Sequence, residues 1–458
     1  MIVVRPRLRF GIEKVRGFAK MIVMTRHCMF AVVSAVLLFS APAQADLIGH
    51  GGMVRSIDVS PDGRTVITGS FDFTARLWDF GDQSEVAVLD AHEGPVTSVR
   101  FSPDSKLAVS TSDDMTAIVW DVASRQQRYK LKGHAHKVMT SAFSVDGKKL
   151  ATGSWDKTVK LWSLETGELL QTITAKAPVN AVVFFDGDQK IAVGGHLPLI
   201  EVFDLASGDP DGKFDGHKMG ITALRVSPDG KALMSASIDK SVKFWNLEKR
   251  EEINSIEVRN TQVYDAAYSS DGKRIVTASK DGYVVEWDLE SMAPVHEIHA
   301  HDRIAWAVAY APGGQFAVSA SSDEQARVWH METGDRIGLV STPVGEPQPW
   351  LESDHPGAKL YPKCARCHAL TADGPSRSGP HFANLFGRKV GSVSGYHYSD
   401  ALKSADFEWN DETLFRLFDI GPDKMLPGTK MPVQRVTDDA QLTALVDYLK
   451  VLTGKAQE

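Results

Sequence analysis

Residues 50–79 read HGGMVRSIDVSPDGRTVITGSFDFTARLWD and combine short apolar runs with a tight turn. The apolar residues stand in two runs, Val54 to Val59 and Val66 to Ile67, and Pro61-Asp62-Gly63 separates them. Short runs of alternating hydrophobicity bounded by Pro, Asp and Gly are typical of half-buried strands joined by turns. The stretch therefore predicts antiparallel β-structure.

The same pattern recurs seven times along the chain. An aromatic residue and a polar residue mark each unit, at spacings of 42, 42, 41, 42, 42 and 42 residues: Trp78-Asp79, Trp120-Asp121, Trp162-Ser163, Phe203-Asp204, Trp245-Asn246, Trp287-Asp288 and Trp329-His330. A histidine stands 28 residues before five of these aromatics, at His50, His92, His134, His217 and His301. Such a regular period predicts an array of similar β-units.

These units resemble the WD40 repeat family, in which units of about 40 to 45 residues each build a four-stranded propeller blade. The resemblance covers residues 46–340 and implies an all-β, seven-bladed propeller closed into a ring. In the family, a His, a Ser or Thr, an Asp and the Trp of one blade form a hydrogen-bonded set. The first three units match with His50, Thr68, Asp72 and Trp78, then His92, Ser110, Asp114 and Trp120, then His134, Thr152, Asp156 and Trp162. The resemblance therefore implies a structural role for these histidines.

The fourth unit and the two ends of the array depart from the pattern. The fourth unit has Ala175, Leu197 and Phe203 where the family has His, Asp and Trp, so we expect this blade to be the loosest or to be adapted to a contact. Only residues 46–49 precede the first unit, too few for a full strand. We therefore expect residues 336–340 to complete the last blade.

A cluster of three histidines in the sixth and seventh units could indicate a metal site. The odd step from His296 to His299 places these two side chains on opposite faces of a strand, however, and His301 occupies the histidine position of the repeat. Metal ligands must converge on one point. The pattern therefore favours a structural interpretation.

Beyond the repeats, residues 341–352 contain Pro343, Pro347 and Pro349, and this composition predicts a short, stiff linker. The motif Cys364-Ala365-Arg366-Cys367-His368 follows. Its spacing is that of haem c attachment, in which both cysteines form thioethers to the vinyl groups and the histidine binds the iron. Cys364, Cys367 and His368 are therefore candidate haem-binding residues.

A redox or zinc-binding cysteine pair is the alternative interpretation of this motif. The third cysteine of the chain, Cys28, lies in the N-terminal segment, so no second cysteine pair exists to complete a zinc site. The motif therefore favours haem.

The following residues resemble a class I cytochrome c of the mitochondrial type. The resemblance rests on Gly379-Pro380, Leu385-Phe386-Gly387-Arg388, Gly395-Tyr396-His397-Tyr398, Trp409, Glu412-Thr413-Leu414 and Pro427-Gly428-Thr429-Lys430-Met431. It covers about residues 353–453 and implies an all-α domain, here residues 353–458, with one covalently attached haem c.

The resemblance also implies the roles of individual residues. Met431 is the distal iron ligand, Pro380 offers its carbonyl to the other nitrogen of His368, and Arg388, Tyr398 and Trp409 surround the haem propionates. Rivals for the distal position are Met425, His381 and His397, and we favour Met431 on ligand type and motif position. Leu402 and Leu417 replace commonly polar family positions, so we expect a more apolar pocket.

Two helices can be placed in this domain. Thr437 is expected to cap a helix with the apolar face Leu442, Leu445, Val446 and Leu449, and a second helix should begin near Asn410. Pro356 and Pro362 interrupt the helix that leads to the haem motif, because proline in a helix interior removes a hydrogen bond and clashes with the preceding turn.

The first 45 residues have the features of a secretory signal peptide. Arg26 and His27 precede an uncharged run from Cys28 to Phe39, and Ala43-Gln44-Ala45 supplies small residues for cleavage. Translation could begin at Met21 or Met24. An uncleaved anchor is the alternative, but the run is short for a membrane span. We therefore expect a soluble periplasmic protein without stable membrane insertion after cleavage.

Charge differs between the two parts of the chain. Residues 46–352 contain 44 acidic and 31 basic residues, a net charge of −13, whereas residues 353–458 contain 13 of each. An acidic propeller does not suit nucleic acid, which requires a basic footprint. It suits a redox partner protein with a basic docking surface.

The sequence therefore predicts a periplasmic c-type cytochrome that transfers single electrons through a His/Met-ligated haem, with the propeller as a platform for protein docking. It is predicted to be an electron carrier and not an enzyme. Two alternatives stay open: a haem-based sensor or assembly factor, and a domain that feeds electrons to a propeller enzyme.

Overall fold

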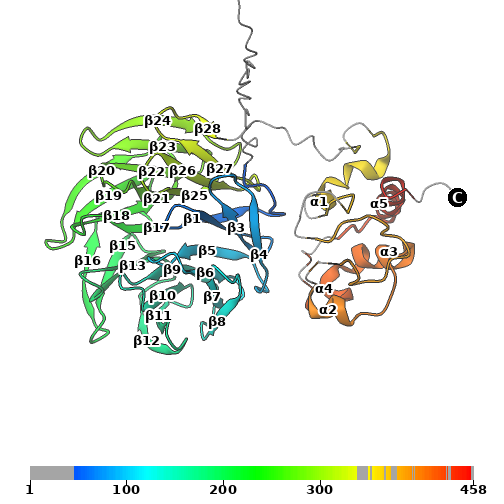
Figure 1. Ribbon diagram of the computed structural model, residues 1–458, viewed down its shortest axis with the longest axis horizontal. Helices are drawn as coiled ribbons and strands as arrows, with labels where there is room; N and C mark the ends of the chain where they lie inside the picture. The colour runs from blue at the N-terminus through cyan, green and yellow to red at the C-terminus, as the bar shows by residue number, and fades with distance from the viewer. Residues whose placement is uncertain are drawn as a thin grey trace, which may run out of the picture. The chain divides into compact units, whose positions relative to one another are not determined.

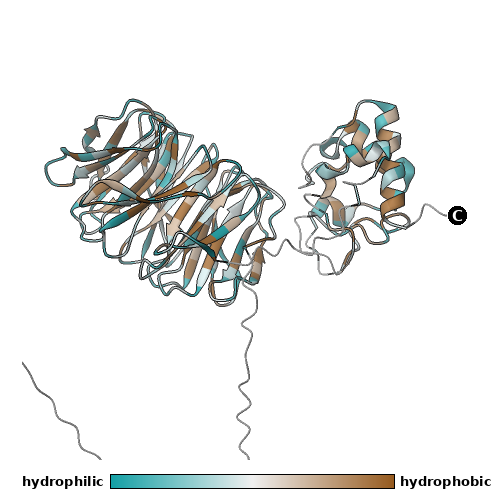
Figure 2. Cartoon of the chain, turned by 90° about the horizontal axis from the view of Figure 1, so that it is seen from above, coloured by the Kyte–Doolittle hydropathy of each residue, from teal (hydrophilic) through white to brown (hydrophobic). Residues whose placement is uncertain are grey.

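The structure is a computed structural model that describes residues 46–337, 349–350, 353–365, 368–372, 379–394, 396, 398–429, 431 and 435–454 (Figure 1). In the first of these ranges the strands form seven four-stranded sheets, and each sheet is built from strands that are consecutive in the sequence. The sheets are the blades of a propeller, as the 42-residue period predicts. Apolar residues gather on the strands, and hydrophilic residues gather in the loops at their ends (Figure 2).

The strands follow the repeat along the chain. The first four blades contain β1 Val54–Val59, β2 Thr65–Ser70, β3 Ala75–Asp79 and β4 Glu85–Leu89; β5 Val96–Phe101, β6 Leu107–Ser112, β7 Thr116–Asp121 and β8 Gln127–Lys132; β9 Val138–Phe143, β10 Lys149–Ser154, β11 Thr158–Ser163 and β12 Leu169–Thr174; and β13 Val179–Phe185, β14 Lys190–Gly195, β15 Leu199–Asp204 and β16 Pro210–Asp215. The last three contain β17 Ile221–Val226, β18 Ala232–Ser237, β19 Ser241–Asn246 and β20 Glu252–Glu257; β21 Val263–Tyr268, β22 Arg274–Ser279, β23 Tyr283–Asp288 and β24 Ala293–His299; and β25 Ala305–Tyr310, β26 Phe316–Ser321, β27 Ala326–His330 and β28 Arg336–Ile337.

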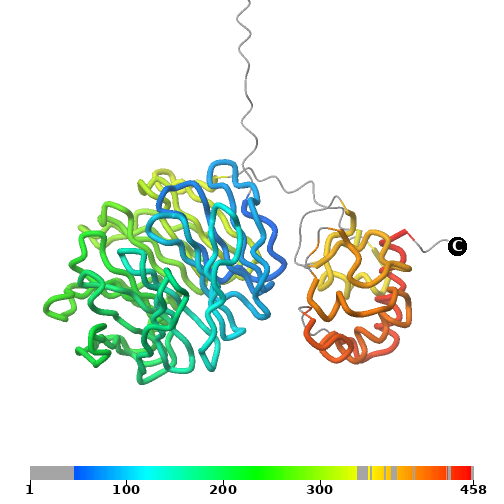
Figure 3. The backbone as a smooth tube through the Cα atoms, turned by 60° about the horizontal axis from the view of Figure 1, so that its bottom comes forward, coloured from blue at the N-terminus to red at the C-terminus, as the bar shows by residue number. Residues whose placement is uncertain are grey.

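All neighbouring strands within a blade are antiparallel. The turns between the first and second strands and between the third and fourth strands therefore lie at one end of every blade, which we call the turn face. The turn between the second and third strands and the connection to the next blade lie at the other end, which we call the connection face. The chain runs from blade to blade around the ring until the last blade meets the first (Figure 3).

The hydrogen-bonded set implied by the resemblance is present in the blades that have the histidine. In the first blade Trp78 Nε1 donates to Thr68 Oγ1 at 2.8 Å, and Thr68 Oγ1 lies 2.7 Å from His50 Nε2. His50 Nδ1 in turn lies 2.8 Å from Asp72 Oδ2. The same contacts recur around His92, His134, His217 and His301. A buried polar group needs such partners, so these histidines serve the fold.

Two blades lack this histidine. In the fourth blade Phe203 fills the position of the Trp and is buried, and the four strands still pair. In the sixth blade Arg259 stands 28 residues before Trp287, at the position of the histidine, and its Nε donates to Asp281 Oδ2 at 3.3 Å. A guanidinium therefore replaces the imidazole as the partner of the blade's Asp. The looseness expected of the fourth blade stays a prediction.

Both ends of the propeller sequence close the ring. Residues Arg336 and Ile337 pair with Trp329 and Val328, as expected of the segment 336–340, of which residues 338–340 lie outside the described residues. The N-terminal segment also contributes, because Leu47 forms an antiparallel bridge with Ala326 on the same strand. Arg336 Nε also donates to Asp46 Oδ1 at 2.8 Å. A single residue, Leu47, is therefore enough to join the N-terminal segment to the last blade, and no full strand is needed.

The histidines of the candidate metal cluster have separate surroundings. His296 Nδ1 lies 2.9 Å from Glu286 Oε2, and the His299 ring packs on Tyr283 with 5.0 Å between centroids. His301 belongs to the hydrogen-bonded set of the seventh blade.

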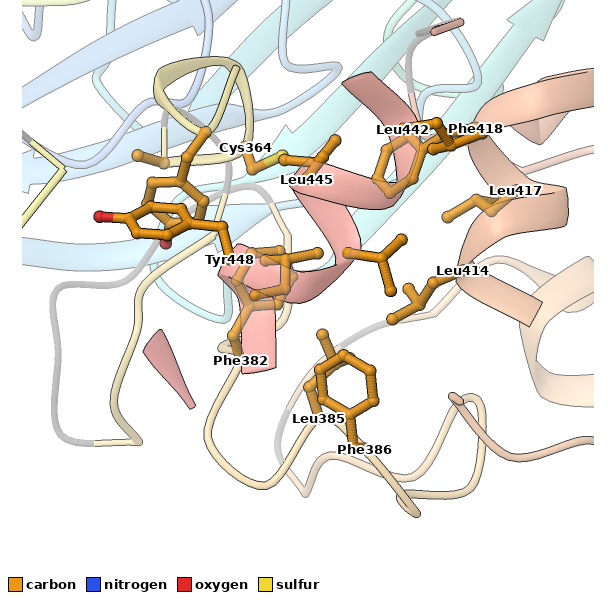
Figure 4. Packing of buried hydrophobic residues seen from close by; sticks show 14 of the residues in the cluster. Cys364, Phe382, Leu385, Phe386, Leu414, Leu417, Phe418, Leu442, Leu445 and Tyr448 are labelled. Atoms are coloured by element: carbon orange, nitrogen blue, oxygen red, sulfur yellow. The ribbon is translucent and has the colours of Figure 1, made fainter. Parts of the chain in front are cut away.

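The second part of the chain is helical. Its elements are the 3₁₀ helix η1 Pro356–Lys359, α1 Pro362–Ala365, α2 Asp400–Ser404, α3 Asp411–Ile420, α4 Pro422–Met425 and α5 Asp439–Leu452. Pro356 and Pro362, which were expected to interrupt the helix before the haem motif, each begin a short helix. In the first turn of a helix the missing N–H of proline costs nothing. Between α3 and α5, Leu414, Leu417 and Phe418 pack against Leu442 and Leu445 (Figure 4).

The start of α5 differs from the expectation. Thr437 was predicted as the cap, but the structure places the N-cap at Asp438, whose side chain accepts from Gln441 N–H at 2.8 Å. The carboxylate binds the free N–H groups of the first turn, so the helix begins one residue later. The helix near Asn410 begins as predicted, with Asn410 as its cap.

No helix within the described ranges is long and apolar enough to cross a membrane.

Candidate haem-binding site

The haem motif lies at the end of α1. Cys364 is buried in this helix, and the backbone N–H of His368 donates to the Cys364 carbonyl at 3.0 Å. This hydrogen bond holds the histidine one turn beyond the cysteine. Cys367 and Arg366 lie outside the described residues.

The His368 ring is held on two sides. Its Nδ1 lies 2.7 Å from the carbonyl oxygen of Pro380, and its ring stacks on Phe382 at 4.4 Å with 13° between the planes. Because a carbonyl can only accept, Nδ1 carries the proton and the Nε2 lone pair is available for a metal. A ring held in this way is oriented before it binds the iron. Phe382 was not among the residues expected to hold His368. Its place two residues after Pro380 is the signal in the sequence that points to it.

A cavity next to His368 brings most of the predicted site residues together. Its walls include Cys364, His368, Pro380, Arg388, Trp409 and Met431. The remaining walls are apolar and come largely from α3, α5 and the segment 382–385: Phe382, Leu385, Leu414, Leu417, Phe418 and Leu449. Leu417 is one of the two leucines expected to make the pocket apolar. Such walls suit a large flat macrocycle with few polar atoms.

Backbone pairing brings Arg388 and Trp409 to this cavity. Gly387 N–H donates to the Trp409 carbonyl at 2.7 Å, and Trp409 N–H donates to the Arg388 carbonyl at 2.9 Å. The side chains of two residues that are 21 positions apart in the sequence therefore line the same pocket.

Arg388 offers a charge that the described part of the chain does not neutralise. Its Nη1 donates to the carbonyls of His381 at 2.9 Å and Ala383 at 2.7 Å, and its buried Nε has no hydrogen-bond partner among the described residues. Burial lowers the pKa of this guanidinium, and the nearby Tyr398 opposes the shift. A half-buried cation with a spare buried donor fits an anionic group such as a haem propionate.

Tyr398 is buried, and its hydroxyl accepts from Val393 N–H at 3.2 Å. Burial raises the pKa of this hydroxyl. Its contact with a propionate stays a prediction.

The candidates for the distal position are separated by the structure. Met431 lies on the cavity wall, and its backbone N–H donates to Thr429 Oγ1 at 3.2 Å. Met425 in α4 and His381 are described but do not line this cavity, and His397 lies outside the described residues. The cavity thus has a nitrogen donor and a thioether on its walls, which together with the thiol of Cys364 form a donor set that fits haem c.

Comparisons with known proteins agree with both parts of the chain. The family model for the WD domain, G-beta repeat, matches residues 43–79, 83–121, 125–163, 208–246, 251–288 and 292–330. These six segments leave out the fourth unit, which has Ala175, Leu197 and Phe203 at the positions that define the repeat.

The family model for cytochrome c matches residues 355–453. Cytochrome c of Gibberella zeae is 44% identical over 95 residues, which cover 20% of this chain and 89% of that protein. Cytochrome c of Arabidopsis thaliana is 42% identical over 95 residues, which cover 20% and 84%. A cytochrome c homolog of Rickettsia typhi is 33% identical over 113 residues, which cover 24% and 64%.

The predicted fold class, a seven-bladed WD40 propeller followed by a helical cytochrome c domain, is confirmed. The predicted cofactor, a covalently attached haem c, is confirmed as well. The C-terminal domain transfers electrons through this haem. The chain belongs to the WD40 repeat family in its first part and to the cytochrome c family in its C-terminal domain.

Proposed function

We propose that the protein is a periplasmic one-electron carrier in which His368 and Met431 hold the haem iron and the propeller docks a redox partner protein. The observation that carries this proposal is the common cavity of His368 and Met431, beside which Pro380 fixes the protonated nitrogen of the imidazole. Bound haem supplies an iron that cycles between the ferric and ferrous states.

The residues of the chain set the conditions for this exchange. The thioether of Met431 raises the reduction potential relative to a second histidine. The carbonyl of Pro380 increases the basicity of His368 by accepting its Nδ1 proton. Leu414, Leu417 and Phe418 line the pocket with apolar side chains, which would limit the access of water to a bound haem, and His368 and Met431 would occupy both protein-ligand positions of its iron.

Replacement of Met431 by leucine tests the ligation. We expect Met431→Leu to abolish the weak red absorption band of a Met–iron bond in the ferric protein and to open the ferrous iron to carbon monoxide. Met425→Leu is the matched control, because Met425 does not line the cavity, and it should keep the band and resist the gas like the wild type. The reverse pattern, or ready uptake of carbon monoxide by the wild type, would favour another distal ligand or a gas sensor.

The turn face of the propeller supports the docking proposal. Glu165, Glu248, Glu290 and Glu332 occupy the same position in the turns between the third and fourth strands of four blades, and all four are exposed. Their side chains form no ion pair with a described residue, so they are available to a partner. Together with the net charge of −13 on residues 46–352, they favour a basic docking surface on the partner.

Neutralising these glutamates tests the docking. A redox partner is first cross-linked and purified from the native periplasm, and the rate of electron exchange with it is measured against ionic strength. In the variant with all four glutamates replaced by glutamine, we expect this rate to fall about tenfold at low salt and to lose much of its salt dependence, because electrostatic steering is weakened.

The control carries Glu93→Gln and Asp302→Asn, which remove acidic charge from the connection face, and it should behave like the wild type. An unchanged salt dependence in the four-residue variant would contradict docking at the turn face. Recovery of only unrelated proteins with an intact propeller would contradict a docking role altogether.

The periplasmic location rests on residues 1–45, which lie outside the described residues. The signal peptide proposed there ends at Ala45, so cleavage would leave Asp46 at the N-terminus. The contacts of Asp46 with Arg336 and of Leu47 with Ala326 support this site, because cleavage there spares the closure of the ring. Sequencing the N-terminus of the protein from its native cells tests the proposal, and a first residue before Arg26 would indicate an uncleaved anchor.

A further inference from the structure

A second cavity, of about 520 Å³, lies on the axis of the propeller. Its walls include residues from the first strand of every blade: β1, β5, β9, β13, β17, β21 and β25. These strands form the innermost layer of the ring (Figure 1).

A β-bulge at the second residue of each of these strands shapes this cavity. The pairing between first and second strands skips one residue in all seven blades: Arg55, Thr97, Met139, Asn180, Thr222, Tyr264 and Trp306. All seven skipped residues line the cavity. A bulge re-aims a side chain that would otherwise follow the alternation of the strand. The ring of bulges thus places one cation, Arg55, among polar and aromatic side chains and one methionine.

Arg55 is positioned by stacking and not by an acidic partner. Its guanidinium lies over the ring of Trp306 at 4.6 Å, and the rings of Trp306 and Tyr264 are 4.3 Å apart. Trp306 is itself held by a 2.7 Å hydrogen bond from its Nε1 to Ser322 Oγ. Arg55 forms no hydrogen bond or ion pair with any described residue. A stacked guanidinium keeps its edge donors free for a planar, bidentate acceptor.

The other charges on the cavity wall leave one positive charge in excess. Arg225 is paired with Asp265, since its Nη2 donates to Asp265 Oδ1 at 2.9 Å. Asp58 accepts from the backbone N–H of Phe101 at 2.8 Å, and among the described residues Arg100 donates a hydrogen bond only to the carbonyl of Val99. Three arginines therefore face two aspartates. The excess is unusual in a propeller whose net charge is negative.

Burial adds to the cost of this excess charge. It lowers the pKa of the Arg55 guanidinium, with Asp265 opposing the shift, and it lowers the pKa of Arg225 in the same way. Burial also raises the pKa of Asp58, with Arg100 opposing the shift. A bound anion would offset the cost of burying the excess positive charge.

We propose that the axial cavity binds a small organic carboxylate, whose carboxylate group lies between Arg55 and Arg100 and whose apolar part lies against Trp306, Tyr264 and Met139. One negative charge neutralises the excess of one positive charge, which favours a monocarboxylate over phosphate. The mixed wall suits a molecule with an apolar body and a charged end. The site is separate from the haem cavity and does not depend on electron transfer.

Calorimetric titration of the full-length holoprotein in low-chloride buffer tests the proposal, with benzoate as the probe and benzamide as its neutral analogue. Benzoate should bind saturably, and benzamide should bind at least tenfold more weakly because it carries no charge. Arg55→Gln and Arg100→Gln should each lower the affinity for benzoate at least tenfold. Arg303→Gln, which changes an exposed arginine of the connection face, should leave it unchanged.

Further measurements separate a lost site from a lost fold. Arg55→Lys keeps the charge but not the planar fork, so it should bind benzoate with intermediate affinity while the far-ultraviolet circular dichroism stays that of the wild type. Absence of saturable benzoate binding by the wild type would overturn the proposal. So would equal affinity for benzamide, an affinity insensitive to Arg55, or tighter binding of inorganic phosphate than of benzoate.

Discussion

Single residues in this protein act through partners that are distant in the sequence. Asp239 shows how. Burial alone would raise the pKa of its carboxyl group, but hydrogen bonds from Ser241 and from the N–H of Lys218, together with His217, lower the pKa to about 2. For His217, burial lowers the pKa of the imidazole, and Asp239 opposes the shift. The neutral ring can then accept a hydrogen bond from Ser235.

These shifts predict that acid destabilises the propeller. As the pH falls below 6.5, the unfolded chain protonates His217 before the folded chain does, and between 3.8 and about 2 the same holds for Asp239. The unfolded state binds more protons in both ranges, so the free energy of unfolding must fall with pH. Urea unfolding followed by circular dichroism at pH 7, 5.5, 4 and 3 measures this fall.

The variant Asp239→Asn sharpens the measurement. It leaves His217 without its carboxylate partner and should cost about 1–3 kcal/mol at pH 7. Its stability should also decline less steeply than that of the wild type below pH 4, because one titrating group is gone. The control Asp335→Asn, at an exposed turn residue, should match the wild type at each pH. A larger effect of the control would contradict the assignment.

At the scale of elements, local signals predicted the helices α3 and α5 but misplaced the start of α5. The N-terminus of α5 has three candidate caps in a row, Thr437, Asp438 and Asp439, and each could accept from the first turn. Asp438 is the cap because the chain is extended there, with φ −97° and ψ 116°. Which of these neighbouring residues caps the helix therefore depends on the backbone conformation of the chain where the helix begins.

The two neighbours at this helix end allow a direct test. Asp438→Ala should lower the free energy of unfolding of the cytochrome domain by about 1 kcal/mol, because the Gln441 N–H loses its acceptor. Thr437→Ala removes the side chain that the sequence favoured and should change the stability by less than about half as much. Thermal unfolding of the ferric protein measures both, and equal losses would contradict the assignment of the cap.

At the scale of the whole molecule, the two ends of the repeat array meet in one blade. Leu47 and the strand β28 both pair with β27, so the last blade contains residues almost 290 positions apart. The ring is therefore closed by backbone pairing of its two ends within one blade. The charge of the ring is also a property of the whole, because the antiparallel register gathers like turns of different blades on one face.

The sequence by itself determined the number of blades, the residues of the hydrogen-bonded sets and the haem motif. Each of these is encoded in spacing: a 42-residue period, a 28-residue step from His to Trp, and two cysteines followed by a histidine. These spacings are sufficient because each repeat unit forms its own strands, and because the residues of the haem motif are close together in the sequence.

The tertiary structure decided which residues meet across these units. The seven bulge residues recur at the period of the repeat, but only the folded ring shows that they are bulged and that they converge on one axis. The resemblance implied that Pro380 serves His368 and that Arg388 and Trp409 share a site, and the structure shows the hydrogen bonds that bring them there. The physical reason is that a bulge changes the face of the strand on which a side chain lies. In the same way, the packing of blades in a ring or of helices around a pocket brings together residues that are distant in the sequence. The axial arginines were therefore not visible in the sequence, whereas the haem ligands were.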